Sequence, residues 1–368
     1  MALTLTNFTA VSMPKIDAIH IGDDGRVAAT PAAHARTIDC GGAFLSPGWC
    51  DLHVHVWHGG TDISVRATEA GRATGVTAMA DAGSAGEANF HGLREYVIEP
   101  HAETIRAFLN IGSIGLVACN RVSELIDMRS IDVERTMAVI EANRDVICGV
   151  KVRASGVIVG SWGITPAKIA KRVAEIFNLP LMVHVGEAPP LIDEVFDILK
   201  PGDIVTHCFN GKKAGSIRDT AALFDQARRL SEQGVRMDIG HGQASFCFET
   251  ARASIGDGLR PWSISTDLHL RNIRGPVLDL ATTASKLMAV GLPFEETVDA
   301  ITVRPRETMG LDPVPGVGAR AEFTLFKVAD VDQEVTDSQG NTMRLARMLE
   351  PLATVIGDSH EPAERRLT

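Results

Sequence analysis

The sequence predicts an α/β fold: a (β/α)8 TIM barrel over residues 43–311, carrying a small β-sandwich domain built from residues 1–42 and 312–368. Short apolar segments alternate with helix-like segments through the middle of the 368-residue chain, which is the rhythm of such a barrel. Both ends contain only short β-like runs. No Gly-x-Gly-x-x-Gly motif follows the first expected strand, so a doubly wound open sheet is the weaker alternative.

About eight strand–helix units are expected in the barrel. The expected strands are Ala43–His55, Thr77–Ala82, Ile105–Ile111, Val146–Arg153, Leu181–Val185, Asp203–His207, Val235–Ile239 and Trp262–Asp267. The expected helices include Ser64–Thr74, Val133–Asn143, Thr165–Phe177, Asp219–Gln233 and Val277–Val290. Thr165 and Pro166 resemble an N-cap followed by proline at the first helical position.

Neither end of the chain forms a sheet large enough to be stable alone. The β-like runs are Leu3–Val11, Ala18–Ile21, Ala321–Val328 and Ala353–Val355, with turns at 23–25 and 338–341. We therefore expect one small domain assembled from both ends, with the barrel inserted between them.

The amino-acid composition limits which kinds of molecule the protein is expected to bind. The formal net charge of −10 argues against a nucleic acid or an anionic membrane as the main partner. No apolar run is long enough to cross a bilayer, and the first residues show no secretory signal. The six cysteines are scattered without a Cys-x-x-Cys pair, which is typical of buried thiols in a reduced cytoplasm. A cytoplasmic location is expected, and a homo-oligomer stays open.

Two histidines separated by one residue, His53 and His55, follow an apolar run. Strand side chains alternate, so both imidazoles point to the same side. Such a pair is half of a transition-metal site. Taken alone, the pair could equally be two hydrogen-bonded core histidines.

The residues at the ends of the other expected strands distinguish these two interpretations. In a (β/α)8 barrel, functional groups lie at the carboxyl ends of the strands. Residues of metal-ligand type stand near the ends of four later strands, in the order Lys151, His184, His207 and Asp267. Arg153 shares a face with Lys151. His241 lies in the glycine-rich segment Ile239–Gly242, where it either contacts substrate or only orders the loop.

Simpler roles exist for each of these residues. Lys151 could form a Schiff base or pair with a carboxylate, and Arg153 could pair with a loop carboxylate. His184 and His207 could be core histidines, and Asp267 could cap the loop that follows it. Five polar strand ends in this order are much harder to explain by chance than any one of them.

With these residues in place, the chain resembles the amidohydrolase superfamily, in the dihydroorotase-like branch of dinuclear metal hydrolases. The segment Pro47–His55 is similar to the family's turn into its first strand. Gly316–Phe326 is similar to the family's return into the small β domain, with Glu322 where aspartate is usual. The resemblance covers essentially the whole chain.

The resemblance implies two divalent metal ions, with Zn²⁺ the expected metal. His53, His55 and Asp267 would bind the buried ion, and His184 and His207 the more exposed one. Lys151 would be carboxylated by CO2 and bridge both, since burial makes a neutral lysine amine available. A metal-bridging hydroxide would attack a carbonyl while Asp267 shuttles the proton.

The substrate implied by the branch name does not fit the first strand. Dihydroorotases usually carry an arginine two positions after the second histidine, where this chain has Trp57. Arg153 could hold a substrate carboxylate instead. We therefore expect removal of an acyl group, such as acetyl, from a small carboxylate-bearing ester or amide. A cyclic amidohydrolase of the dihydroorotase type is the alternative, and a non-catalytic barrel scaffold is the second.

Overall fold

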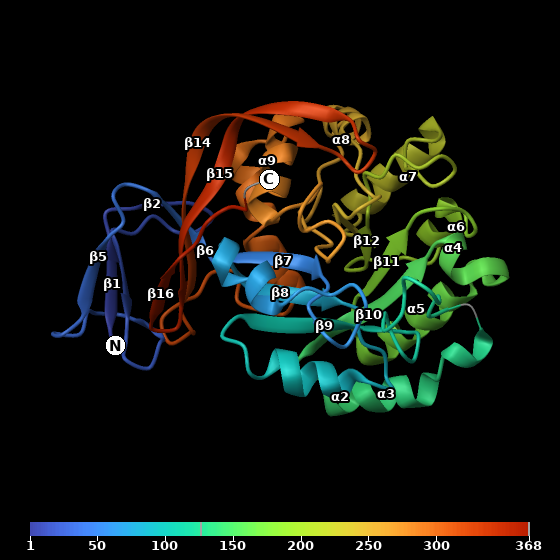
Figure 1. Ribbon diagram of the computed structural model, residues 1–368, viewed down its shortest axis with the longest axis horizontal. Helices are drawn as coiled ribbons and strands as arrows, with labels where there is room; N and C mark the ends of the chain where they lie inside the picture. The colour runs from blue at the N-terminus through green and yellow to red at the C-terminus, as the bar shows by residue number, and fades with distance from the viewer. Residues whose placement is uncertain (126, 367–368) are drawn as a thin grey trace.

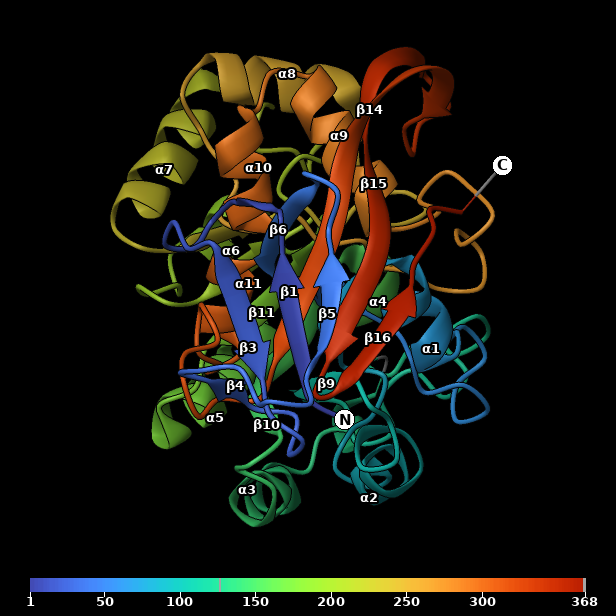
Figure 2. The same ribbon diagram turned by 90° about the vertical axis from the view of Figure 1, so that its left-hand side faces the viewer.

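The computed structural model describes residues 1–125 and 127–366. Figure 1 shows a barrel of strands flanked by helices on the right, and two sheets on the left that contain the first and last parts of the chain. In Figure 2 these terminal sheets lie in front of the barrel. No helix among the described residues is both long and apolar enough to cross a membrane.

Seven parallel strands form the barrel sheet, each hydrogen-bonded to the next along the chain. They are β7 (Trp49–Val54), β8 (Val76–Ala82), β9 (Thr104–Asn110), β10 (Ile147–Ala154), β11 (Leu181–Val185), β12 (Ile204–Thr206) and β13 (Arg236–Asp238). Every residue of β7 and β8 is buried. Continuous apolar strands are expected where a parallel sheet is covered on both faces. The carboxyl ends of all seven strands meet at one end of the barrel.

The eighth segment closes the sheet without forming a regular strand, although a strand was predicted over Trp262–Asp267. Single bridges join Ser263 to β13 and Leu268 to β7. The backbone N–H of Asp267 donates to His53 O at 2.7 Å, which ties the segment to the first strand. Asp267 adopts a left-handed φ of 49°, and this conformation ends the extended backbone.

Helices and connecting turns cover the barrel. The helices are α1 (Ala67–Ala70), α2 (Phe90–Leu93), α3 (Val133–Ala142), α4 (Gly156–Val159), α5 (Thr165–Phe177), α6 (Ile192–Phe196), α7 (Ala221–Glu232), α8 (Phe248–Gly256), α9 (Leu280–Ala289), α10 (Phe294–Ala300) and α11 (Val303–Thr308). Helix α5 begins at Thr165 itself, with Ile164 as its N-cap. The helix expected over Ser64–Thr74 is interrupted at Gly71, where a Cβ would lie 2.8 Å from Ala67 O.

The two ends of the chain form two further sheets. One has the order β4–β3–β1–β5 and the other β16–β15–β14–β6–β2. Their strands are β1 (Leu3–Thr6), β2 (Thr9–Ala10), β3 (Ala18–Ile21), β4 (Val27–Ala28), β5 (Arg36–Asp39), β6 (Phe44–Pro47), β14 (Glu322–Thr336), β15 (Thr342–Ile356) and β16 (Ser359–Pro362). Leu3, Leu5, Ile19, Phe323 and Val355 pack in one apolar cluster between them.

The single strand expected over Ala43–His55 is two strands. Phe44–Pro47 pairs with β14 in a terminal sheet, and Trp49–Val54 begins the barrel. Gly48 lies at the junction, where a Cβ would come within 1.9 Å of Thr77 Oγ1. The chain can therefore cross from one sheet to the other only with glycine at this position.

Strands β14 and β15 form a hairpin much longer than the two short runs expected from the sequence. Its base belongs to the terminal sheet, while its outer half runs over α9 toward the barrel (Figure 1). The turn residue Ser338 donates its N–H to Phe246 O at 3.0 Å, and Asp337 accepts from Phe248 N at 3.0 Å. The hairpin thus reaches from the terminal sheets to the loop that follows β13.

Candidate active site

His53 in β7 and His55 directly after this strand lie side by side, as their spacing predicts. Both side chains are buried, and their Nε2 atoms face the same carboxylate oxygen. Asp267 Oδ1 lies 3.4 Å from His53 Nε2 and 3.1 Å from His55 Nε2. Burial, and next the charge of Lys151, hold the pKa of His53 well below its usual value.

Hydroxyl groups behind these imidazoles fix their orientation. Thr206 Oγ1 donates to Asp238 Oδ2 at 2.7 Å, so it is left to accept from His53 Nδ1 at 2.9 Å. Ser84 Oγ lies 3.0 Å from His55 Nδ1. A proton on Nδ1 leaves the Nε2 lone pair free to bind a metal ion.

Removing the hydroxyl behind His53 should therefore weaken metal binding. We expect Thr206→Val to reduce metal affinity by about 10- to 100-fold, because the imidazole loses the acceptor that fixes its tautomer. Titration of the metal-loaded protein with a competing chelator measures this. Thr77→Val is the matched control, since the buried Thr77 hydroxyl has no hydrogen-bond partner among the described residues. Equal affinities in the two variants would contradict the orienting role.

Lys151 reaches the same centre from β10. Its Nζ lies 3.2 Å from His53 Nε2 and 3.3 Å from Met182 Sδ. Burial lowers the pKa of this lysine to about 7, so a neutral amine is accessible near neutral pH. Gly83 leaves room for the side chain, because a Cβ there would lie 2.8 Å from Lys151 Cγ.

The remaining two predicted ligands face each other. His184 Nδ1 and His207 Nε2 are 2.8 Å apart, and His207 Nδ1 donates to Gly240 O at 2.6 Å. Burial lowers the pKa of His207 to about 3 and that of His184 well below its usual range. Both imidazoles are therefore neutral, with nitrogens directed at a common point. His207, like Asp267, has a left-handed backbone, with a φ of 69°.

Asp267 lies at the meeting point of these groups. Burial opposes its ionisation, but the facing imidazoles of His53 and His55 outweigh burial and hold its pKa well below the usual value. Gly242 packs behind the carboxylate, where a Cβ would lie 2.6 Å from Asp267 Oδ2. Any larger residue at position 242 would displace this carboxylate.

The donor set fits divalent metal ions. Ligand atoms of His53, His207 and Asp267 lie within 4.8 Å of one another. The imidazoles of His53, His184 and His207 have lowered pKa values, so their lone pairs are available at neutral pH. Neutral imidazoles with carboxylate oxygen are ligands that Zn²⁺ prefers.

Arg153, expected to bind a substrate carboxylate, already holds one from the protein. Its Nε and Nη2 atoms donate to Glu124 at 2.7 and 2.6 Å. The Glu124 side chain is 0% exposed and that of Arg153 is 19% exposed. Among the described residues, Nη1 of Arg153 has no hydrogen-bond partner, so this edge could still meet a ligand. Arg153 is also the register neighbour of His184 on the adjacent strand.

His241 is buried and both of its ring nitrogens are engaged. Nε2 accepts from Lys286 Nζ at 2.9 Å, and Nδ1 donates to Gly242 O at 3.0 Å. Lys286 also donates to Pro276 O and Thr336 O. Ser338, in the hairpin turn, donates to Gly242 O at 2.9 Å. These contacts order the loop that packs against Asp267.

Several residues of the site carried no signal in the sequence. Thr206, Ser84 and Asp238 orient ligands but have ordinary strand or turn surroundings. Lys212 follows β12 in a loop and pairs with Glu187 of the preceding loop at 2.8 Å. Lys212 could have been predicted only from its position five residues after His207. Outside a helix or strand, such a spacing does not show where a side chain lies.

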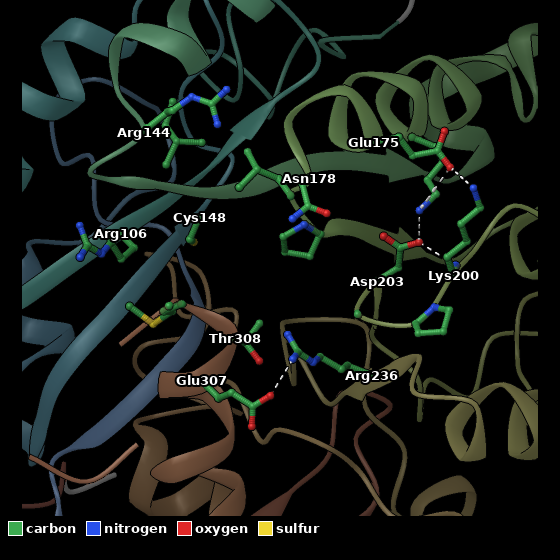
Figure 3. A pocket seen from close by; sticks show the side chains of 18 of the residues that line it. Arg106, Arg144, Cys148, Glu175, Asn178, Lys200, Asp203, Arg236, Glu307 and Thr308 are labelled. Carbon is green, nitrogen blue, oxygen red and sulfur yellow. Dashed lines mark hydrogen bonds and ion pairs between the residues drawn. The ribbon is translucent and has the colours of Figure 1, made fainter. Parts of the chain in front are cut away.

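A separate polar pocket of about 840 Å³ lies where the barrel strands begin (Figure 3). Arg236, the first residue of β13, pairs there with Glu307 at 3.0 Å. Lys171 pairs with Asp203, which directly precedes β12. These four charges are thus paired within the protein, and the predicted site residues are at the opposite end of the strands.

Comparisons with known proteins agree with this geometry. A family model described as a deacetylase-like composite domain matches residues 316–359, which include the whole of the long hairpin. A deacetylase of Agrobacterium fabrum is 55% identical over 354 residues, covering 94% of this chain and 87% of the relative. The crystal structure of a dihydroorotase has 52% identity and a TM-score of 0.95, covering 100% of this chain and 99% of its own.

A more distant structure has the same arrangement of the chain. The crystal structure of an adenine deaminase is 33% identical with a TM-score of 0.90, covering 98% of this chain and 99% of its own. The relatives thus share a fold and differ in the activity that their names give. The chain belongs to the amidohydrolase superfamily, in its dihydroorotase-like branch, and is a hydrolase.

Proposed function

We propose that the protein is a dinuclear metal-dependent deacylase that removes an acetyl group from a small carboxylate-bearing ester or amide. The observation that carries the proposal is the convergence of four histidines, Lys151 and Asp267 at the carboxyl ends of the barrel strands. Imidazole nitrogens, an accessible lysine amine and an ionised carboxylate form a donor set for two divalent ions.

In this proposal the ligands divide between two ions. His53, His55 and Asp267 would hold one ion, His184 and His207 would hold the other, and a carboxylated Lys151 would be a ligand of both. When bound, the ions, which we expect to be Zn²⁺, supply an acidified water and polarise the scissile carbonyl. The geometry that supports this is the shared direction of the Nε2 atoms of His53 and His55.

Asp267 moves the proton. Its carboxylate takes the proton of the attacking water as the new C–O bond forms. It then gives that proton to the leaving oxygen or nitrogen as the acyl bond breaks. Gly242 and the ordered His241 loop hold the carboxylate from behind, so His241 acts on the loop and not on substrate.

A deacetylase is favoured over the dihydroorotase alternative by the surroundings of Trp57. Its indole packs on two glycines: a Cβ at Gly60 would lie 2.1 Å from the ring, and one at Gly92 3.1 Å from it. The position where a dihydroorotase would hold its carboxylate anchor is thus part of an apolar contact. The Agrobacterium relative, which is 55% identical to this chain over 354 residues, is named a deacetylase.

The metal-loaded protein should hydrolyse acetylated acids in preference to dihydroorotate. A panel containing O-acetyllactate, N-acetylalanine and dihydroorotate tests this, with kcat/KM measured for each. Turnover of dihydroorotate alone would establish the cyclic amidohydrolase instead. Elemental analysis of the same preparation should give about two metal ions per chain, whereas a scaffold would hold none after metal supplementation.

A further inference from the structure

Two cationic side chains flank the imidazole of His184, and they differ in what holds them. Arg153 stands beside His184 in register on the neighbouring strand, and its carboxylate partner Glu124 is fully buried. Lys212 approaches from the loop after β12. The charges of both residues contribute to the lowered pKa of His184, after burial and His207.

Hydrogen bonds and close packing fix the loop that carries Lys212. Asn210 is buried, donates to His207 O and Gly215 O, and accepts from Lys212 N at 3.0 Å. Gly215 packs so closely on the neighbouring loop that a Cβ would lie 1.9 Å from Gly186 O. The loop that carries Lys212 is therefore anchored to the backbone of a predicted metal ligand.

The Lys212 ammonium group lies at the edge of the site. The position that a Cβ of Gly186 would occupy is 3.4 Å from Lys212 Nζ, 3.5 Å from His184 Nε2 and 3.2 Å from Ser155 Oγ. These three polar atoms thus lie on the same side of Gly186, which has no side chain to cover them. His184 Nδ1 faces His207. In the proposed function His184 binds its ion through Nδ1, so its Nε2 would carry the proton and be a donor.

The present partner of Lys212 is a replaceable counterion. Glu187 Oε1 lies 2.8 Å from Lys212 Nζ, and the two side chains are 42% and 17% exposed. Partial burial opposes ionisation of Glu187, but hydrogen bonds from Lys212 and Ser155 outweigh it and lower its pKa to about 2. Because Glu187 is 42% exposed, water can replace its hydrogen bonds when another carboxylate pairs with Lys212. Glu124 is fully buried and cannot leave Arg153 in this way.

We propose that Lys212 is the specificity-determining residue that binds the substrate carboxylate, which takes the place of Glu187 beside His184. The inference rests on the proposed deacylase function and gives it a substrate class: acylated hydroxy or amino acids with a free carboxylate. Arg153 then contributes only through its Nη1 edge.

Paired anionic and neutral probes test this on the metal-loaded protein. Lys212→Met should raise KM for O-acetyllactate by about 10- to 100-fold, the effect of losing a hydrogen bond to a charged group. It should leave kcat/KM for the neutral O-acetyllactamide within about twofold. Lys213→Met is the matched control, because it removes the same charge from the next, exposed position. Glu187→Gln removes the competing carboxylate and should lower KM for O-acetyllactate or leave it unchanged.

If the Lys212–Glu187 ion pair only holds its two loops together, a different pattern of kinetic effects is expected. Both variants would then weaken turnover of the anionic and neutral probes equally, and that result would overturn the inference. Calorimetric measurement of lactate and lactamide binding tests the role of Lys212 independently of the proposed deacylase function. If the wild type hydrolyses neither acetyl probe but Lys212→Met still weakens lactate binding selectively, only the acetyl assignment fails. Lactate binding that is equal in the wild type and Lys212→Met, or undetectable in the wild type, would also count against Lys212.

Discussion

Replacement of Asp267 by asparagine should reduce kcat by about 10³-fold, because the amide has the size of the carboxylate but cannot accept the proton of the attacking water. The loss should appear in kcat for every substrate, anionic or neutral, since the proton transfer is common to all of them. Steady-state kinetics on the acetylated probes measure it.

Asp267 is also an expected metal ligand, so metal content must be measured on the same preparation. Two retained ions together with the loss of kcat would assign the effect to proton transfer. If activity follows metal content and returns fully at high metal concentration, Asp267 serves only as a ligand.

Arg153→Met should have the second large effect, on stability. It should lower the free energy of unfolding by about 3–5 kcal/mol, because it leaves the carboxylate of Glu124 buried and unpaired. The double variant Arg153→Met/Glu124→Gln should recover much of this loss, since removing both charges is far less costly than removing one. Urea unfolding of the metal-loaded proteins measures both.

The double variant also separates structure from binding at this position. If Arg153 contacts substrate through Nη1, the stabilised double variant should still show a raised KM for O-acetyllactate and an unchanged KM for O-acetyllactamide. Equal losses in the free energy of unfolding in the single and double variants would show that an unpaired Glu124 carboxylate is not the cause of the loss.

The barrel and the proximity of the expected ligands could be predicted because both depend on local, repeating patterns. Alternation along one strand places His53 and His55 on the same side, and parallel strands bring their polar ends together whatever lies between them. Apolar runs such as Leu181–Val185 match observed strands. The segment before Asp267 was predicted as a strand because it is one of the short apolar segments that alternate with helix-like ones, but the left-handed φ of Asp267 has no sequence pattern.

The partners of the charged residues could not be predicted, because they come from irregular loops. Glu124 lies in the segment between β9 and α3, and nothing in its spacing points to Arg153. The outer half of the β14–β15 hairpin was missed for a related reason. Its residues, such as Asp330, Asp332 and Glu334, are polar and only partly buried, so they carry no apolar alternation.

The long hairpin also determines when during synthesis the site can be completed. All six expected metal ligands have been translated once Asp267 has left the ribosome. The turn that holds the loop behind Asp267 is made 71 residues later, at Ser338, and the hairpin can dock only after both of its strands exist. A nascent chain thus contains every expected ligand before the contacts behind Asp267, the proposed proton carrier, can form. Activity should therefore appear only once the hairpin is complete.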